Sequence, residues 1–301
     1  MHSFEQIMTI AKQSARNRLA VAWPHDEDSL QAVIQAMDEG LAEPILVGEP
    51  GRIRSAAGNS ARLRELTIVE ESLPEDAAAT AVRLVREGQA EALMKGLLET
   101  SVLLKAVLDP EHGLRTGHVL SHVALFSVPG RDQMLLLSDA AMNIAPDVEQ
   151  KRQIVLNAVE VAHTLGTANP AVAMLCAKEK VNPRMPATVD AQQLHELNQS
   201  GEIPGCVISG PLALDNAISP AAARQKGIDD PVAGRADILI TPDIEAGNIL
   251  YKALVFFSGA ANAGIIAGAS APIVLTSRAD SRQSKLVSIA LAVSAGRTQQ
   301  R

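Results

Sequence analysis

The sequence is poor in cysteine and in aromatic residues. Of its 301 residues only Cys176 and Cys206 are cysteines, and aromatic residues make up 2%. Two thiols exclude a disulfide framework and a metal site built from several cysteines, so a reducing cytoplasm is the expected location. Because aromatic side chains are scarce, small aliphatic residues must fill the core. Such residues suit thin layers in which helices pack closely on a sheet.

Positive charge is also scarce. Lys and Arg number 27 against 34 for Asp and Glu, which gives a formal net charge of −7. Binding to a nucleic-acid backbone usually requires a basic surface, so nucleic acid is not an expected partner. A small anion is a different matter, because it needs only a few well-placed cations.

Strongly apolar runs are missing as well. The first residues lack the basic start and apolar run of a signal peptide. Residues 253–277 form an uncharged stretch of 25, but Gly259, Asn262 and Pro272 interrupt it, and Ala and Gly dilute its hydrophobicity. A helix that spans a bilayer needs ~20 strongly apolar residues. We therefore expect a helix, a turn and a buried strand there, and no membrane partner.

What the sequence does contain is an alternation of short aliphatic runs with helical patterns. Continuous aliphatic runs indicate strands buried on both faces, and repeated strand–helix units predict an α/β fold. A chain of this length exceeds one typical core, so two domains are expected. The expected strands are residues 19–23, 44–48, 66–69, 92–96, 122–128, 134–137, 171–175, 206–208, 237–240, 263–266 and 272–275.

Polar segments follow many of these runs. In open α/β sheets, ligands bind beyond the carboxyl ends of the strands, so a binding site is expected among these segments. They are residues 94–101, 138–143, 178–186, 210–216, 241–248 and 276–281.

Taken together, these segments resemble the phosphate acetyltransferase/phosphate butyryltransferase family, with the closest likeness to its butyryltransferase branch. Each segment alone is a weak signal, but their shared order along an α/β chain is specific, and the resemblance covers nearly the whole chain. The most specific segments are Ser138-Asp-Ala-Ala-Met-Asn143, Asn182-Pro-Arg-Met-Pro186, Gly210-Pro-Leu-Ala-Leu-Asp-Asn-Ala217, Pro242-Asp-Ile-Glu-Ala-Gly-Asn248 and Leu275-Thr-Ser-Arg-Ala-Asp-Ser281.

The resemblance implies a fold and an activity. The fold is shared with isocitrate and isopropylmalate dehydrogenases: two α/β/α sandwich domains with a cleft between them. Residues 1–138 with 277–301 would form the N-terminal domain, and residues 139–276 the second. The activity interconverts acyl-coenzyme A plus phosphate with acyl phosphate plus coenzyme A, by direct transfer of a butyryl or other short acyl group. The expected partners are these substrates and further copies of the chain, with no cofactor and no metal.

The resemblance also implies a catalytic pair, Ser277 and Arg278. In the family the serine hydroxyl supports the thiolate and the arginine holds charge. A guanidinium offers a planar fork for phosphate or a developing oxyanion, and the helix that starts at Ser281 adds backbone N–H groups. In the acetyltransferase pattern an aspartate seven residues after the serine is proposed as the base for the thiol. This chain has Ser284 there.

The base is therefore left open. Asp280 is the nearest substitute, and Asp139, Asp215 and Asp243 are alternatives that each follow an expected strand. A carboxylate in such a position equally often accepts loop N–H groups, so a structural role is the competing interpretation.

The remaining candidates would bind substrate. Lys105 aligns roughly with a family arginine thought to contact the coenzyme's phosphates, although a solvated helix face explains it equally well. Lys95 directly follows an apolar run and is harder to explain as a surface residue. The other candidates are Arg115, Ser121, Asp139, Asn143, Asp215, Asn216 and Asp243.

Two alternatives compete with the acyltransferase. A metal-dependent 2-hydroxy-acid dehydrogenase of the same fold would need clustered aspartates with a catalytic tyrosine and lysine, and Tyr251 is the sole tyrosine. A non-catalytic protein that binds acyl-coenzyme A or acyl phosphate would explain the missing aspartate. The presence of Ser277 and Arg278 argues against it, since a pure binder needs no support for a thiolate.

Overall fold

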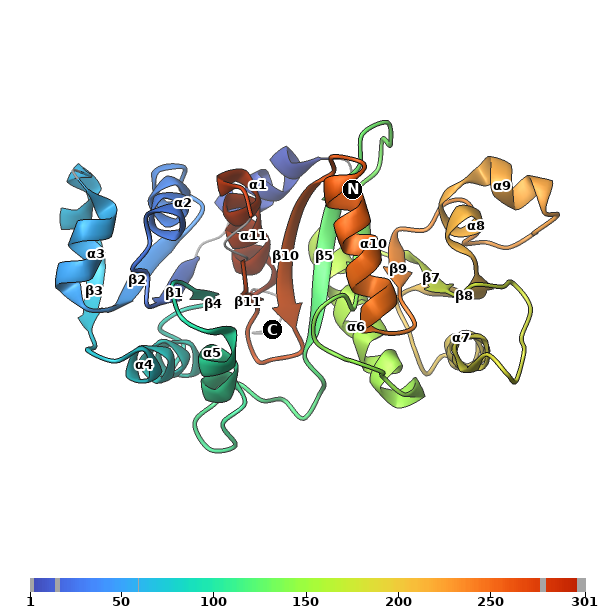
Figure 1. Ribbon diagram of the computed structural model, residues 1–301, viewed down its shortest axis with the longest axis horizontal. Coiled ribbons are helices and arrows are strands. Elements are labelled where there is room, and N and C mark those ends of the chain that lie inside the picture. The colour runs from blue at the N-terminus through green and yellow to red at the C-terminus, as the bar shows by residue number, and fades with distance from the viewer. Residues whose placement is uncertain (1–2, 14–16, 59, 277–279, 297–301) are drawn as a thin grey trace. The chain divides into compact units, whose positions relative to one another are not determined.

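The computed structural model describes residues 3–13, 17–58, 60–276 and 280–296. Strands and helices alternate along the chain, and two compact units are present (Figure 1). The N-terminal unit comprises Phe4–His118 and Ala263–Arg301, and the central unit comprises Val119–Asn262 with Met1–Ser3. The mixed α/β class expected from the aliphatic runs is thus confirmed.

The N-terminal unit is built on a sheet in the order β3-β2-β1-β4-β11-β10. Strand β1 pairs in parallel with β2 and β4, β11 pairs in parallel with β4, and β10 with β11 is antiparallel. Because the parallel strands point the same way, their carboxyl ends meet at one edge. The strands are β1 (Arg18–Ala22), β2 (Glu43–Gly48), β3 (Thr67–Glu70), β4 (Ala92–Lys95), β10 (Ala261–Ala267) and β11 (Ile273–Val274).

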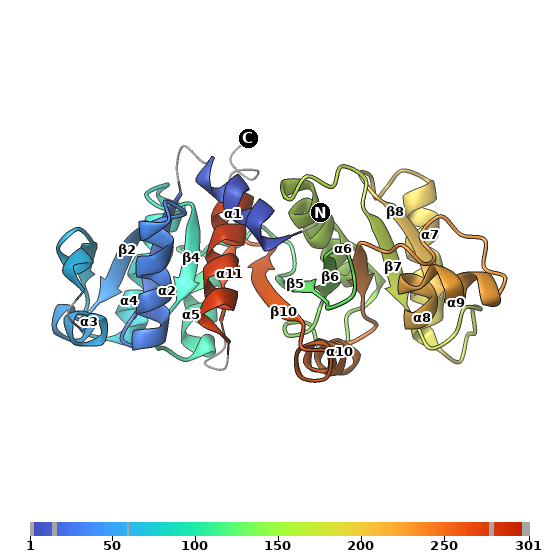
Figure 2. The ribbon, with the colours of Figure 1, turned by 90° about the horizontal axis from the view of Figure 1, so that it is seen from above.

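Helices cover both faces of this sheet. Helices α1, α2 and α11 lie on one face, and α4 and α5 on the other (Figure 2). Helix α11 is buried along almost all of its length because it packs against α1, α2 and the sheet. The helices are α1 (Phe4–Lys12), α2 (Glu27–Asp38), α3 (Pro50–Ala57), the 3-10 turn η1 (Ala61–Arg64), α4 (Pro74–Arg86), α5 (Thr100–Val107) and α11 (Arg282–Ala295).

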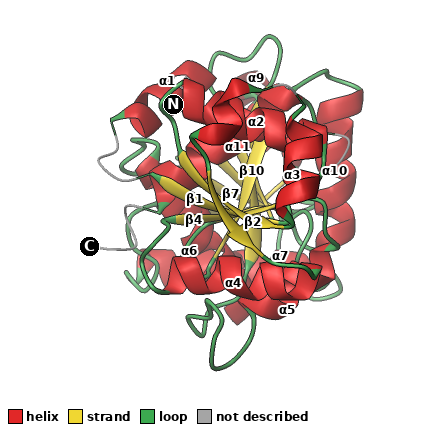
Figure 3. Cartoon of the chain, turned by 90° about the vertical axis from the view of Figure 1, so that its left-hand side faces the viewer, coloured by secondary structure: helices red, strands yellow, loops and turns green. Residues whose placement is uncertain are grey.

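The central unit repeats this plan on a sheet in the order β5-β6-β9-β7-β8. Strands β5 and β6 are antiparallel, and the other neighbours are parallel. Helices lie on both sides of the strands (Figure 3). The elements are β5 (Ser121–Ser127), β6 (Leu135–Ser138), α6 (Val148–Thr164), β7 (Ala171–Leu175), α7 (Pro186–Gln199), β8 (Val207–Leu212), α8 (Leu214–Ile218), α9 (Pro220–Gln225), β9 (Ile238–Ile240) and α10 (Ile244–Phe256).

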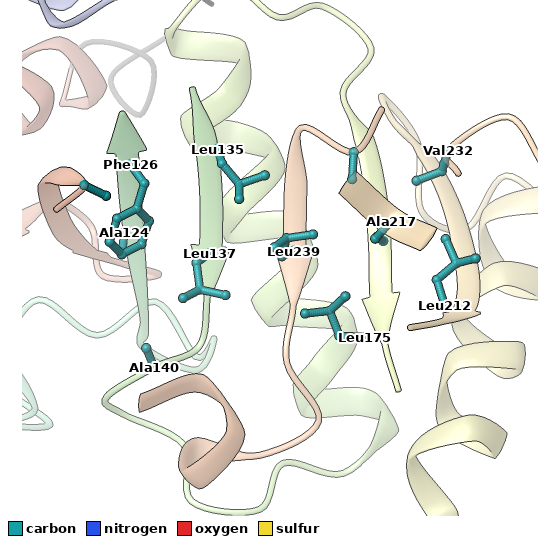
Figure 4. Packing of buried hydrophobic residues seen from close by; sticks show 13 residues of the cluster. Ala124, Phe126, Leu135, Leu137, Ala140, Leu175, Leu212, Ala217, Val232 and Leu239 are labelled. Carbon is teal, nitrogen blue, oxygen red and sulfur yellow. The ribbon is translucent and has the colours of Figure 1, made fainter. Parts of the chain in front are cut away.

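Aliphatic side chains form the core of the central unit, with one buried aromatic. Phe126 on β5 lies beside Leu135 and Leu137 of β6, and the row continues through Leu239 to Leu175 (Figure 4). Tyr251 of α10 meets the Phe126 ring edge-on, with ring centroids 5.2 Å apart. Small residues such as Ala124 complete the layer, as the scarcity of aromatics predicts.

The contact-defined units divide after His118 and Asn262, whereas the sequence placed the boundaries after residues 138 and 276. Strand β5 is antiparallel to β6, and β6 pairs in parallel with β9, so residues 121–138 belong to the central sheet. The pairing of β11 with β4 holds residues 273–274 in the N-terminal unit.

The uncharged stretch 253–277 contains the end of α10 followed by β10 and β11, as expected. Among the helices that the structure describes, none has the length and apolarity needed to cross a bilayer.

Candidate functional site

A small cavity lies at the carboxyl ends of β1, β4 and β11 in the N-terminal unit. Its volume is about 160 Å³. Pockets for drug-sized ligands occupy ~300–1,000 Å³, so this cavity suits a small ligand or one small group of a larger ligand. Its walls come from the starts of α2 and α11 and from the segment after β4, through Asp26, Asp28, Ser29, Lys95, Gly96, Leu97, Thr276 and Lys285.

The segment after β4 passes very close to the turn after β1. A Cβ atom on Gly96 would lie 2.4 Å from the Trp23 carbonyl oxygen, so this close approach requires glycine. Gly96 N–H donates to Ala22 O at 2.8 Å, which continues the pairing of the two strands. Lys95 turns its Nζ back toward its own loop and donates to Gly96 O and Leu98 O at 3.0 and 3.1 Å.

Helix α2 presents its N-terminus to the cavity. Asp26 is the N-cap, and its Oδ1 accepts a hydrogen bond from Ser29 N at 2.8 Å. Ser29 is buried, and its hydroxyl makes no hydrogen bond to another described residue. Backbone N–H groups in the first turn and the positive end of the helix dipole favour negative charge nearby.

Helix α11 contributes a buried cation. Lys285 lies in its first turn and is 3% exposed. Its backbone N–H donates to Ser281 O at 3.0 Å, but its side chain forms no hydrogen bond or ion pair with any other described residue. A lysine this buried is usually paired, and Lys285 instead lines the cavity without an ionic partner among the described residues.

The predicted catalytic pair, Ser277 and Arg278, lies outside the described residues. Thr276, which precedes the pair in sequence, lines the cavity. Asp280 is half-buried just before the Ser281 N-cap of α11. Ser284, at the family's aspartate position, shares a 2.9 Å contact between hydroxyl oxygens with Ser281 and donates its backbone N–H to the same oxygen. Ser284 therefore belongs to the cap of the helix.

In the central unit, Asp139 holds a loop together. It is 3% exposed, and its carboxylate accepts backbone N–H groups from His122, Ala141, Met142 and Asn143 at 2.9–3.2 Å. The Asn143 side chain donates to Asp139 Oδ2 at 2.5 Å and to Leu120 O at 2.8 Å. These contacts give both side chains a structural role in the loop after β6.

Two further candidates, Ser121 and Asp243, form structural hydrogen bonds. One lies in the interior and the other at the start of a helix. Ser121 is fully buried at the start of β5, and its Oγ accepts from Asn157 Nδ2 at 2.8 Å. Asp243 is the N-cap of α10 and accepts from Ala246 N at 2.8 Å.

Asp215 and Asn216 lie beside a larger pocket of the central unit. Asn216 is fully buried and donates through Nδ2 to Glu179 Oε1 at 2.6 Å. Lys226 Nζ contacts Glu179 at 2.7 Å and Asp215 at 3.2 Å. The hydrogen bond from Lys226 is the main cause that lowers the pKa of Glu179 to about 2, and the hydrogen bond from Asn216 adds to it. Glu179 and Lys226 also line an open pocket of about 790 Å³.

Lys105 and Arg115 are exposed, on α5 and in the segment after it. The structure thus brings Lys95 and the residue before Ser277 to one cavity, while the other candidates lie elsewhere in the N-terminal unit or in the central unit. Sequence reasoning missed Lys285 and Ser29. A lysine inside the apolar pattern Leu286, Val287, Ile289 was the available signal. No group of three or more potential ligands for a metal occurs among the described residues.

Comparison with known proteins places these features in a family. The sequence pattern of the family described as "Phosphate acetyl/butaryl transferase" matches residues 65–293. A probable phosphate butyryltransferase of Bacillus subtilis is 50% identical over 277 residues, which is 92% of each chain. A phosphate acetyltransferase of Thermotoga maritima is 43% identical over 287 residues, 95% of this chain and 97% of the relative.

A solved structure shows the same similarity in three dimensions. The crystal structure of a branched-chain phosphotransacylase from Enterococcus faecalis superposes with a TM-score of 0.82 at 37% identity. The superposition covers 93% of this chain and 98% of that one.

Proposed function

The chain belongs to the phosphate acetyl/butaryl transferase family, and from this membership we propose that it moves a short acyl group between coenzyme A and inorganic phosphate. A phosphate oxygen attacks the thioester carbonyl, the C–S bond breaks, and the products are acyl phosphate and coenzyme A. The proton that phosphate loses balances the proton that the thiolate gains.

The observation that carries the proposal is the cavity at the carboxyl ends of β1, β4 and β11. It lies where ligands of open α/β sheets bind, it has room for a group the size of phosphate, and it contains Lys95 and Lys285. Thr276 in its wall leads directly into Ser277 and Arg278. This arrangement supports roles in which Arg278 stabilises the charge on the reacting oxygens and Ser277 supports the leaving thiolate.

The base for the thiol is part of the proposal. Asp139 and Asp243 are engaged by backbone N–H groups of their own loops. Asp215 pairs with Lys226. These contacts favour Asp280, which is the candidate nearest in sequence to Ser277.

The acyl group is proposed to be butyryl or another short chain. Relatives with extensive similarity are named for acetyl, butyryl and branched-chain substrates, so family membership does not select among them. Discrimination amounts to only ~1–3 kcal/mol per methylene group even in a well-formed pocket.

We also propose a cytoplasmic location and activity without cofactor or metal. The two-domain fold with a cleft, as in isocitrate dehydrogenase, is proposed as well. Finally, we propose that several copies of the chain assemble. Helix α10 and its C-cap support the last, because Ile249 and Phe256 of the helix are 69% and 76% exposed and the C-cap Phe257 is 93% exposed. Exposed apolar clusters often mark protein interfaces. Sedimentation of the F256D/F257D variant tests this, with monomers expected.

The comparisons with known proteins do not favour the 2-hydroxy-acid dehydrogenase or the non-catalytic binder. The Tyr251 hydroxyl is 2.5 Å from Asn262 Nδ2, and its ring packs on Phe126, so this tyrosine serves the core of the central unit. A non-catalytic binder is distinguished by experiment.

The test is phosphate-dependent release of free thiol from acetyl-, butyryl- and longer acyl-coenzyme A thioesters. We expect release only when phosphate is present and no loss of rate with EDTA. Saturable binding of butyryl-coenzyme A without any thiol release would favour the binder instead. Release at equal rates with and without phosphate would indicate a thioesterase.

A further inference from the structure

The buried amine of Lys285 is the feature that the known properties of the chain do not explain. We infer that Lys285 binds the phosphate substrate, or the phosphoryl group of acyl phosphate, inside the cavity between α2, β4 and α11. The inference rests on the proposed function and names a binding residue within that site.

The position of Lys285 is costly without a partner. Removal of a polar group from water is unfavourable unless a partner replaces the water, and the cost is greatest for a charged group. Lys285 is 3% exposed and has three potential donors, yet its side chain contacts no acceptor among the described residues. An anion that enters the cavity would supply the acceptors.

The cavity is small. At about 160 Å³ it lies below the ~300–1,000 Å³ typical of pockets for drug-sized ligands. A tetrahedral oxyanion fits this space. The ligand is therefore a small anion or a single terminal group.

Further donors line the same cavity as Lys285. Ser29 places a hydroxyl without a partner among the described residues in the same wall, at the positive end of α2. Of the two nearby carboxylates, Asp26 is held by its cap to Ser29 N, and Asp28 is exposed. Neither forms an ion pair with Lys285.

Lys95 provides an internal contrast. It lines the same cavity, but its Nζ already donates to the carbonyls of Gly96 and Leu98. Removal of its amine should therefore affect phosphate binding less than removal of the Lys285 amine. A nonspecific effect of reduced positive charge would make the two variants equal.

The experiment compares Lys285→Met with Lys95→Met and with Lys252→Met, an exposed lysine on α10. Methionine keeps the length and apolar body of the lysine side chain. We expect Lys285→Met to raise the KM for phosphate about 10-fold or more, the size of one charge-assisted hydrogen bond, and to change the KM for acyl-coenzyme A less than 2-fold. Lys285→Arg should restore part of the loss.

A second readout does not depend on catalysis. Phosphate that binds the folded protein raises its Tm, and this rise should be present in the wild type, absent in Lys285→Met and retained in Lys252→Met. If Lys285→Met fails to fold, Ser29→Asp replaces it. That substitution puts a negative charge in the cavity, while acidic residues are well tolerated in the first turn of a helix, and it should also abolish the phosphate effect.

The outcomes separate the inference from the proposed function. An active wild type with an unchanged KM for phosphate in Lys285→Met would overturn the inference and leave the function intact. A raised KM for acyl-coenzyme A with an unchanged KM for phosphate would also overturn it, because the amine would then bind a phosphate of the coenzyme. An inactive wild type whose Tm still rises with phosphate through Lys285 would overturn the function alone.

Discussion

Two buried lysines, one in each unit, differ in what surrounds them. Lys151 on α6 of the central unit is 5% exposed, and its Nζ lies 2.5 Å from Asp190 Oδ2 on α7. Lys285 on α11 of the N-terminal unit is 3% exposed and has no acceptor among the described residues. The two side chains have the same chemistry and nearly the same burial. They differ in whether the amine has an ionic partner.

The difference shows how a structural charge is distinguished from a ligand-binding charge. Burial of an ion pair is compensated within the protein, and loss of one member leaves the other uncompensated. Burial of a lone amine is compensated when a ligand arrives. Lys151 should therefore matter for stability at all phosphate concentrations, and Lys285 chiefly when phosphate is bound.

The largest expected effect is on the stability of the paired lysine. Lys151→Met leaves the Asp190 carboxylate without its partner and should lower the free energy of unfolding by about 3 kcal/mol. Urea denaturation measures this, with Lys285→Met as the matched variant. If Lys285→Met in phosphate-free buffer is destabilised as much as Lys151→Met, the contrast between the two lysines is lost.

The next effect is on turnover. Arg278→Ala removes the guanidinium proposed to hold charge on the reacting oxygens, and turnover should fall by on the order of 100-fold or more, as after loss of an oxyanion donor. Ser277→Ala should lower kcat more than it changes either KM. Steady-state kinetics measures both. An Arg278→Ala protein with wild-type turnover would remove the role assigned to Arg278 and leave Lys95 and Lys285 as the cations of the proposed site.

The side chain of His25 is a further titratable group to compare with the two lysines. Its hydrogen-bond partner favours the neutral imidazole. Its Nε2 accepts from Glu49 N at 3.1 Å, and burial, followed by the charge of Arg52, lowers its pKa below the ordinary value of 6.5. Below pH 6.5 the unfolded chain therefore binds a proton that the folded chain does not, so stability should fall as the pH drops toward the lowered pKa.

His25→Gln removes this titration and should flatten the pH dependence of Tm below pH 6.5. His118→Gln, at an exposed position, is the control and should leave the curve as in the wild type. The same slope in wild type and His25→Gln would assign the acid sensitivity to other groups.

The smallest effect concerns the thiols. Burial raises the pKa of Cys176 and of Cys206 to about 11. Since the thiolate is the reactive form, both should react with Ellman's reagent at pH 8 far more slowly than free coenzyme A does. Addition of urea should expose both to full reaction. Rapid labelling of either thiol in the native protein would contradict the burial assigned to it.

The sequence predicted the elements of the fold better than their grouping. Aliphatic runs at residues 92–96 and 272–275 correspond to β4 and β11, because local pattern determines which segments are strands. The division after residue 138 differs from the units because the pairing of β6 with β9 joins residues about a hundred positions apart. No local signal carries that information.

The site was predictable only in part, for a related reason. The position of Lys95 after an apolar run indicated the edge of the sheet where the cavity lies. Asp139 follows a strand just as Lys95 does, yet its carboxylate accepts hydrogen bonds from the backbone of its own loop. Lys285 interrupts the apolar pattern of its helix, which indicates burial, but that pattern does not say that the side chain lines a cavity. The three side chains differ in their hydrogen-bond partners, and the position of a residue along the chain does not reveal those partners.

The most direct test of the account follows the reaction by ³¹P NMR with butyryl-coenzyme A, phosphate and the wild-type protein. An acyl phosphate resonance should grow in equal amount to the coenzyme A released, and it should grow far more slowly at low phosphate with Lys285→Met. Release of coenzyme A with the inorganic phosphate signal unchanged would contradict the proposed acyl transfer.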